Sequence, residues 1–152
     1  MTLNVFALRS HYRLTLTILT SPLFVALGLS SCAPHISPFS QTAYRQATSL
    51  KVEALELMNE ATTPYEEHEQ DVEELRTEVE KAYEYAKGLP NNEVTTRQWD
   101  ILKDPGRNLL GGFLERWRER STLSRAFVDE AKALVADAFD TIIGLESGKI
   151  KS

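Results

Sequence analysis

Residues 41–87, QTAYRQATSLKVEALELMNEATTPYEEHEQDVEELRTEVEKAYEYAK, decide the fold of this chain. Small and apolar side chains recur along them at steps of three or four residues, which is the spacing of one face of an α-helix. This stripe consists of Ala43, Ala47, Leu50, Ala54, Leu57, Ala61, Tyr65, His68, Val72, Leu75, Val79, Ala82 and Ala86. No part of the chain has the sustained apolar–polar alternation that predicts a strand. The sequence therefore predicts an all-α fold, an elongated antiparallel helical bundle formed by residues 41–152.

Pro64 leaves two interpretations of this stretch open. In the first, residues 41–87 form one long helix of about 70 Å that is kinked at Pro64, because a proline cannot donate to the preceding turn. In the second, Thr63 caps a new helix, with Pro64 at its first position and Glu66 completing a capping box. The stripe keeps its phase through the proline and no glycine marks a helix end there. We therefore favour the long kinked helix.

The C-terminal half predicts three shorter helices separated by turns. Gly88 is expected to end the long helix in a left-handed conformation, and Pro90 prevents its continuation. Short helices are then expected at residues 95–103 and 108–119. A last helix at residues 121–146 carries a broad apolar face, which favours burial against two neighbours.

The N-terminal residues are first positively charged and then apolar. Arg9 and Arg13 supply the positive charge, and an apolar stretch follows at residues 14–29. The sequence Leu-Ser-Ser-Cys then occupies residues 29–32 and contains the only cysteine of the chain. In order and spacing, these features resemble the signal peptide of bacterial lipoproteins, whose lipobox is Leu, two small residues and Cys. The resemblance covers residues 1–32.

The resemblance implies how the protein is processed and anchored. In that family, the cysteine thiol receives a diacylglyceryl group and the signal peptide is cut off before the cysteine. Cleavage would fall between Ser31 and Cys32, and Cys32 would carry the lipid anchor. Ala33 at the next position implies the periplasmic face of the outer membrane, or of the inner or single membrane if the host lacks an outer one. Residues 32–40 then form a tether rich in proline and serine.

Two other interpretations of the N-terminus remain. The pair Ser30-Ser31 also suits the peptidase of an ordinary secretory signal. A retained membrane anchor needs roughly 20 apolar residues. The stretch 14–29 has only sixteen residues, and polar residues and a proline interrupt it. The lipoprotein interpretation explains in addition why the single cysteine stands directly after the two serines.

Charge restricts the partners of the mature protein. The full chain has a net charge of −5, and loss of Arg9 and Arg13 leaves fifteen basic and twenty-two acidic residues, a net charge of −7. Nucleic-acid binding requires a basic surface, so nucleic acid is not an expected partner. An acidic domain is also not attracted to anionic lipid headgroups, so we expect the lipid alone to hold it at the membrane.

The residues give no support for catalysis, a metal or a cofactor. The mature chain has two histidines, His35 and His68, and no serine–histidine–carboxylate arrangement can be argued from their spacing. The acidic run around His68 lacks the Glu-x-x-His spacing of di-iron bundles, because Tyr65 stands three residues before it. We therefore expect a protein that is not an enzyme.

The distribution of charge suggests where a partner would bind. Residues 64–87 have a net charge of −6 and residues 97–125 one of +3. The two segments either pair within the bundle or leave the basic one available to a partner. Arginine and tryptophan dominate binding hot spots, so the candidate contact residues are Arg116, Trp117, Arg118 and Arg120. The expected function is a non-catalytic structural or interaction subunit of the cell envelope; the alternative is a module that holds an apolar or anionic ligand in a helical groove.

Overall fold

The computed structural model describes residues 37–149, which contain five α-helices and no strand. The helices are α1 (Gln41–Asn59), α2 (Glu69–Gly88), α3 (Glu93–Lys103), α4 (Leu110–Arg120) and α5 (Arg125–Gly148). They pack around one core that runs the length of the domain. The prediction of an all-α helical bundle is confirmed.

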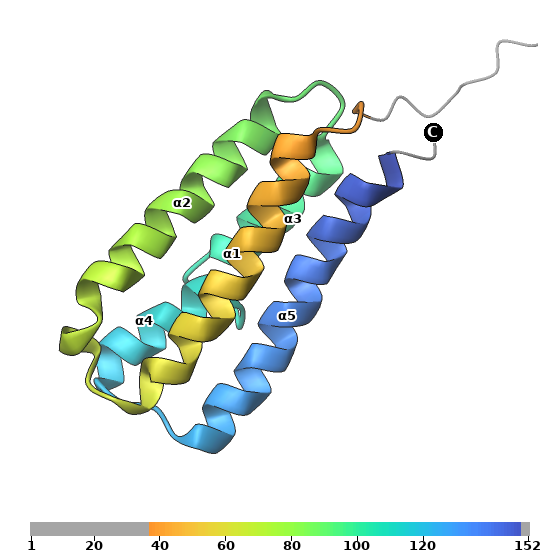
Figure 1. Cartoon of the computed structure of the whole chain (residues 1–152). Coiled ribbons are helices and arrows are strands. Elements are labelled where there is room, and N and C mark those ends of the chain that lie inside the picture. The colour runs from red at the N-terminus through yellow and green to blue at the C-terminus, as the bar shows by residue number, and fades with distance from the viewer. Residues whose placement is uncertain (1–36, 150–152) are drawn as a thin grey trace, which may run out of the picture. The chain divides into compact units, whose positions relative to one another are not determined.

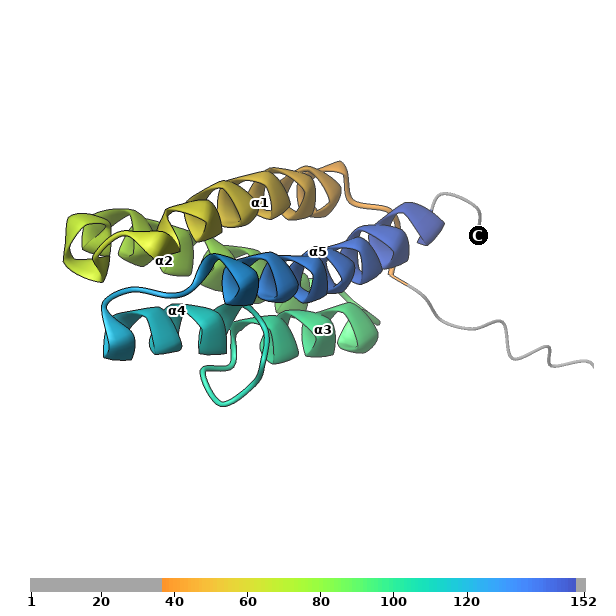
Figure 2. The same cartoon turned by 90° about the horizontal axis from the view of Figure 1, so that it is seen from below.

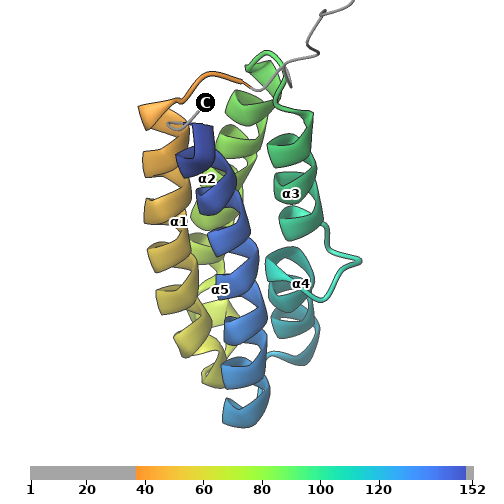
Figure 3. The same cartoon turned by 90° about the vertical axis from the view of Figure 1, so that its right-hand side faces the viewer.

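The bundle has four antiparallel columns, one of which is divided between two helices (Figure 1). Helices α1 and α2 form a hairpin, α3 and α4 follow each other down the third column, and α5 returns along the fourth (Figure 3). α1 packs against α2 and α5, and α3 also packs against α2 and α5. Each long helix therefore has neighbours on two sides, as the broad apolar face of α5 predicts.

The prediction of one long kinked helix is wrong. α1 ends at Asn59, and the chain reverses through two 3₁₀ turns, Glu60–Thr62 and Tyr65–Glu67. Pro64 lies between these turns with extended backbone angles, φ −59° and ψ 134°. The second interpretation is also inexact, because α2 begins at Glu69 rather than at Pro64. A continuous helix would leave half of its stripe without a facing partner, whereas the reversal turns both halves toward one core.

The predicted stripe is nevertheless the buried face of α1 and α2. Eleven of its thirteen residues are buried, and the two exceptions are half-buried. The exceptions are Leu57 and His68, which border the reversal on either side. Met58 is fully buried beside Leu57 and fills the core at the end of α1. Helical periodicity thus identifies the face that packs, whichever way the helix axis runs.

Two glycines allow α4 to start close to the end of α3. A Cβ atom on Gly111 would lie 2.1 Å from the carbonyl oxygen of Lys103, and one on Gly112 would lie 1.7 Å from that of Arg107. Any larger residue would collide with this backbone. The loop between the helices consequently bulges out of the column, as Figure 2 shows.

The remaining helix ends differ from prediction in detail. Gly88 ends α2 as expected, but it is not left-handed; the residue with a positive φ in this connection is Asn91, at 55°. Asn92 then donates from its side chain to the carbonyl oxygen of Ala86 (2.8 Å), which satisfies an open acceptor at the end of α2. α5 begins after Ser124, whose hydroxyl caps it, rather than after Ser121.

Candidate functional site

The end of the bundle where α1 turns into α2 is closed by backbone hydrogen bonds between two connections. The amide of Leu123 donates to the carbonyl oxygen of Ala61 (2.7 Å), and the amide of Tyr65 donates to that of Ser121 (2.8 Å). The Ser121 hydroxyl also donates to Glu66 (2.9 Å). The backbone amide of Glu66 itself and this hydroxyl lower the pKa of the Glu66 carboxyl. Sequence segments about 60 residues apart are thereby joined.

Trp117 fills this end of the bundle and is fully buried. Its indole Nε1 donates to the carbonyl oxygen of Thr63 (3.1 Å), and its ring meets that of Tyr65 edge to face at 5.6 Å and that of His68 at 5.4 Å. Burial raises the pKa of the Tyr65 hydroxyl. We call this group, Tyr65, His68 and Trp117, the aromatic end. A fully buried ring is not accessible to a partner, so Trp117 is a core residue rather than a contact residue.

The three candidate arginines on α4 lie in different surroundings. The guanidinium of Arg116 lies 5.0 Å from the centre of the Phe127 ring on α5. Arg118 forms an ion pair with Glu115 of its own helix, and this contact raises the pKa of Arg118. Arg120 is exposed at the end of α4. Of the predicted group, Arg116 and Arg120 are therefore exposed cations that no ion pair within residues 37–149 includes.

The predicted pairing of the acidic and basic segments occurs at one place in the described chain. Lys103 on α3 donates to Glu80 on α2 (2.8 Å), and this hydrogen bond raises the pKa of Lys103. In a second pair the base is on α2 and the acid is on α4: Arg76 lies 3.8 Å from Glu115. Such half-exposed pairs contribute about 0–1 kcal/mol each, so they do not determine the fold.

Three acidic residues of α2 line a groove together with acidic residues at the C-terminal part of α1 and just after it. This groove of about 480 Å³ runs between the two helices. Its charged lining residues are Glu53, Glu56, Glu60, Asp71, Glu74 and Glu78. The sequence does not reveal this groove, because the two acidic runs meet only after the chain reverses at Pro64. Within residues 37–149, no group of three or more His, Cys, Asp or Glu side chains is placed to hold a metal ion.

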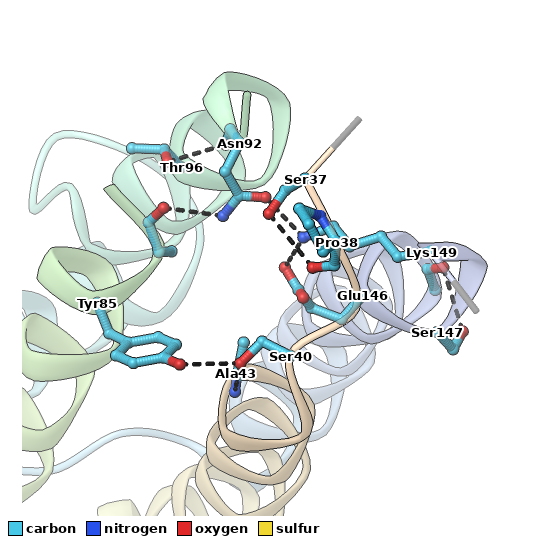
Figure 4. A network of polar contacts seen from close by, with 12 residues as sticks. Ser37, Pro38, Ser40, Ala43, Tyr85, Asn92, Thr96, Glu146, Ser147 and Lys149 are labelled. Atoms are coloured by element: carbon cyan, nitrogen blue, oxygen red, sulfur yellow. Dashed lines mark hydrogen bonds and ion pairs between the residues drawn. The ribbon is translucent and has the colours of Figure 1, made fainter. Parts of the chain in front are cut away.

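The opposite end of the bundle contains a buried polar cluster (Figure 4). Lys149 donates to the carboxylate of Glu146 (2.6 Å) and to the side-chain oxygen of Asn92 (2.6 Å). The exposed fractions of these residues are 8%, 1% and 4% in the same order. Glu146 Oε2 has no hydrogen-bond partner in the described part of the chain. We call this group, with Ser37, the polar end.

Residues 37–40 belong to the polar end rather than to a free tether. Ser37 is buried, and its amide donates to the carbonyl oxygen of Asn91 (3.2 Å). The Ser40 hydroxyl accepts from the amide of Ala43 and so caps α1, and it also shares a hydrogen bond of 2.9 Å with the Tyr85 hydroxyl. The segment that follows the predicted anchor caps α1 and is attached to α2 and to the connection between α2 and α3.

Both ends of the described chain lie at the polar end. Ser37 enters the bundle beside Lys149, which follows the last turn of α5 (Figures 1 and 4). The predicted cleavage and lipidation positions, Ser31 and Cys32, lie outside the described residues. Between residues 37 and 149, none of the helices combines the length and the apolar character that a membrane crossing requires.

Comparison with known proteins finds no matching family model, no similar curated protein and no similar solved structure.

Proposed function

We propose that this chain is a lipid-anchored protein of the bacterial cell envelope, a non-catalytic structural or interaction subunit that faces the periplasm. The observation that carries the proposal is the sequence Leu-Ser-Ser-Cys at residues 29–32 after a positive and then apolar N-terminus. The single cysteine of the chain stands where the lipobox of bacterial lipoproteins requires it. Two or more acyl chains on Cys32 anchor a protein stably, because each buried CH₂ contributes about 0.8 kcal/mol.

A lipid on Cys32 would determine which end of the bundle lies next to the membrane. Ser37 follows Cys32 by five positions, which span at most roughly 18 Å. A lipid on Cys32 therefore holds the polar end next to the membrane, and the aromatic end lies farthest from it. α5 rises about 1.5 Å per residue over its 24 residues, so the bundle extends roughly 36 Å from the polar end. Its sides are then accessible to other proteins.

A second candidate function, a module that holds an apolar or anionic ligand, is favoured by one feature. A groove of about 290 Å³ between α4 and α5 is lined by apolar side chains and by Asn108, Arg116 and Glu130. Pockets that enclose small molecules usually measure about 300–1,000 Å³ and bury most of the ligand. This groove is at the lower limit of that range and is bordered by exposed residues, so the interaction subunit is the better supported function.

Membrane fractionation of cells that express the full chain tests the anchor. Cys32→Ser is expected to move the protein out of the membrane fraction, while a matched change of a serine outside the lipobox, Ser37→Cys, leaves it there. If Cys32→Ser protein stays in the membrane, the lipid anchor is wrong. Stability measurements on residues 33–152 separate the two functions, since added lipid extract raises the melting temperature of a ligand-binding module but not that of a scaffold.

A further inference from the structure

The polar end exposes apolar side chains around its buried cluster. Within residues 37–149, the exposed large apolar or aromatic residues are Phe39, Val52, Tyr85, Val94 and Leu134. Three of these five lie at the polar end, where the start of α1, the α2–α3 connection and the end of α5 come together (Figure 1). Phe39 is in the segment that leads into α1, Tyr85 is in the last turn of α2 and Val94 is in the first turn of α3.

The segments that close this end carry no charge. Residues 37–40 are Ser-Pro-Phe-Ser and residues 88–92 are Gly-Leu-Pro-Asn-Asn. Lys87 and Glu93, which flank the second segment, are opposite in sign. The ion pair of the polar end is buried, so neither of its charges is presented to the outside. Anionic lipid headgroups therefore do not repel this end as they repel the acidic sides of α1 and α2.

Two tyrosines are held close to Phe39. The Tyr44 ring lies 6.3 Å from the Phe39 ring, and the Tyr85 hydroxyl shares a hydrogen bond of 2.9 Å with the Ser40 hydroxyl (Figure 4). A tyrosine ring has an apolar body and a polar hydroxyl, and such rings favour the headgroup level of a membrane. The aromatic residues of the polar end thus have the chemistry of a membrane-contacting surface.

The length of the chain before Ser37 places this surface at the membrane. Lipidated Cys32 is at most roughly 18 Å from Ser37, and Phe39 follows two residues later. Val52 lies eleven residues beyond the start of α1, roughly 16 Å from the polar end, and Leu134 lies roughly 21 Å from the end of α5. The lipid on Cys32 therefore brings the first group of exposed residues to the bilayer and leaves the other two residues above it.

We propose that the polar end is itself a lipid-binding surface, with Phe39, Tyr85 and Val94 in the headgroup region, so that the anchored bundle stands on the membrane in one orientation. Three partly exposed side chains bind a bilayer weakly. The anchor converts this contact into an intramolecular one at high effective concentration, and a weak contact is then formed most of the time. This inference rests on the lipid anchor of the proposed function and adds a second contact with the same membrane.

Quenching of a fluorophore by spin-labelled lipid tests this surface. The full chain is purified with its lipid and reconstituted into phosphatidylcholine vesicles that contain a lipid with a nitroxide on its headgroup. A cysteine for labelling replaces Val94 and, in the matched control, Val52; both valines are exposed, and lipidated Cys32 does not react with the label. We expect quenching several times stronger at position 94 than at position 52.

A charge placed in the surface should weaken the contact. Phe39→Glu should lower the quenching at position 94 severalfold, because a carboxylate is costly to remove from water. Val52→Glu, which adds the same charge in the middle of α1, should leave the quenching at position 94 unchanged. Quenching that Phe39→Glu does not alter, while circular dichroism confirms the fold, would contradict the proposal.

The remaining outcomes separate this proposal from the anchor. Equal quenching at positions 94 and 52 in vesicle-bound protein would show that the bundle moves freely on its lipid, and would overturn the proposal. So would a signal at position 94 that depends on protein concentration in vesicles without nitroxide, because it would come from contact between two copies. Protein that does not float with the vesicles, or that takes up a second label on Cys32, lacks the lipid; the proposed function then fails, and this inference fails with it.

Discussion

The two ends of the bundle are closed by different chemistry. At the aromatic end, Trp117 and Tyr65 fill the core, and backbone hydrogen bonds join two internal connections. At the polar end, a buried ion pair, Glu146 and Lys149, meets the place where the described chain enters and leaves. Internal connections cannot open without unfolding the helices on both sides, whereas chain ends can detach alone. The aromatic end should therefore control global stability and the polar end local opening.

The largest effect is expected from Trp117. Trp117→Ala removes a fully buried indole and should lower the free energy of unfolding by about 3–5 kcal/mol. Trp117→Phe keeps most of the ring but loses the hydrogen bond to Thr63, which should cost about 1–3 kcal/mol because the carbonyl is left unsatisfied. Urea denaturation of residues 33–152 measures both changes. A loss below about 1 kcal/mol for Trp117→Ala would show that this end does not control the fold.

Lys149→Met should have a smaller global effect although it breaks a buried ion pair. Leaving a charge buried and unpaired costs about 3–5 kcal/mol when the structure cannot relax. The last turn of α5 can open instead and expose Glu146 to water. We expect faster hydrogen exchange at the end of α5 and at Ser37, with a loss of global stability clearly below that of Trp117→Ala.

A matched double variant sharpens this test of the polar end. Glu146→Leu with Lys149→Met removes both charges and should restore part of the slow exchange, because an apolar pair needs no hydration while the Asn92 side-chain oxygen still loses its donor. If Lys149→Met lowers global stability by the full 3–5 kcal/mol without local opening, the two ends do not differ as described.

Pro64→Ala tests the reversal between α1 and α2. The extended backbone of Pro64 suits proline, so alanine only increases the freedom of the unfolded chain and should cost about 0.4–1 kcal/mol. For a domain of this size, that corresponds to a melting temperature lower by a few degrees. A continuous kinked helix predicts the opposite sign, because alanine would restore a hydrogen bond inside it. A melting temperature that rises would therefore contradict the reversal.

The smallest effect is expected on the side of the bundle, in the acidic groove between α1 and α2. Glu53→Gln with Glu56→Gln removes two of six facing carboxylates and should stabilise the domain by roughly 0.5 kcal/mol at low salt. The gain should vanish at about 1 M salt, where charges are screened beyond roughly 3 Å. Glu130→Gln with Asp137→Asn, two exposed acids on α5, is the control and should change the melting temperature little at either salt concentration.

The sequence identified the buried face of α1 and α2 but not the reversal that separates them. Ala47 and Val79 occupy the same stripe whether the helix continues or turns back, since both arrangements bury one face of a 3.6-residue period. The length of the predicted helix is the signal that argues for the reversal. A helix of about 70 Å finds no partner of equal length in the C-terminal half, whose longest helix has 24 residues.

The candidate sites depend on this tertiary arrangement more than on local sequence. Trp117 stands between Arg116 and Arg118 in the sequence, but spacing alone does not reveal that its indole donates to Thr63 across the bundle. Spacing also does not reveal the buried pair of Glu146 and Lys149. An acid and a base three residues apart near a helix end usually form a solvated pair, and their burial here depends on Asn92 and on residues 37–40.

The mass of the mature protein tests the central claim most directly. Full-length chain is expressed in a bacterial host, extracted from the membrane with detergent and measured intact, with fragmentation to locate any modification. A lipid-anchored envelope subunit should begin at Cys32 and carry a diacylglyceryl group on the Cys32 sulfur. A chain that retains residues 1–31, or one that begins at Cys32 with an unmodified thiol, would contradict the lipid anchor and the orientation of the bundle derived from it.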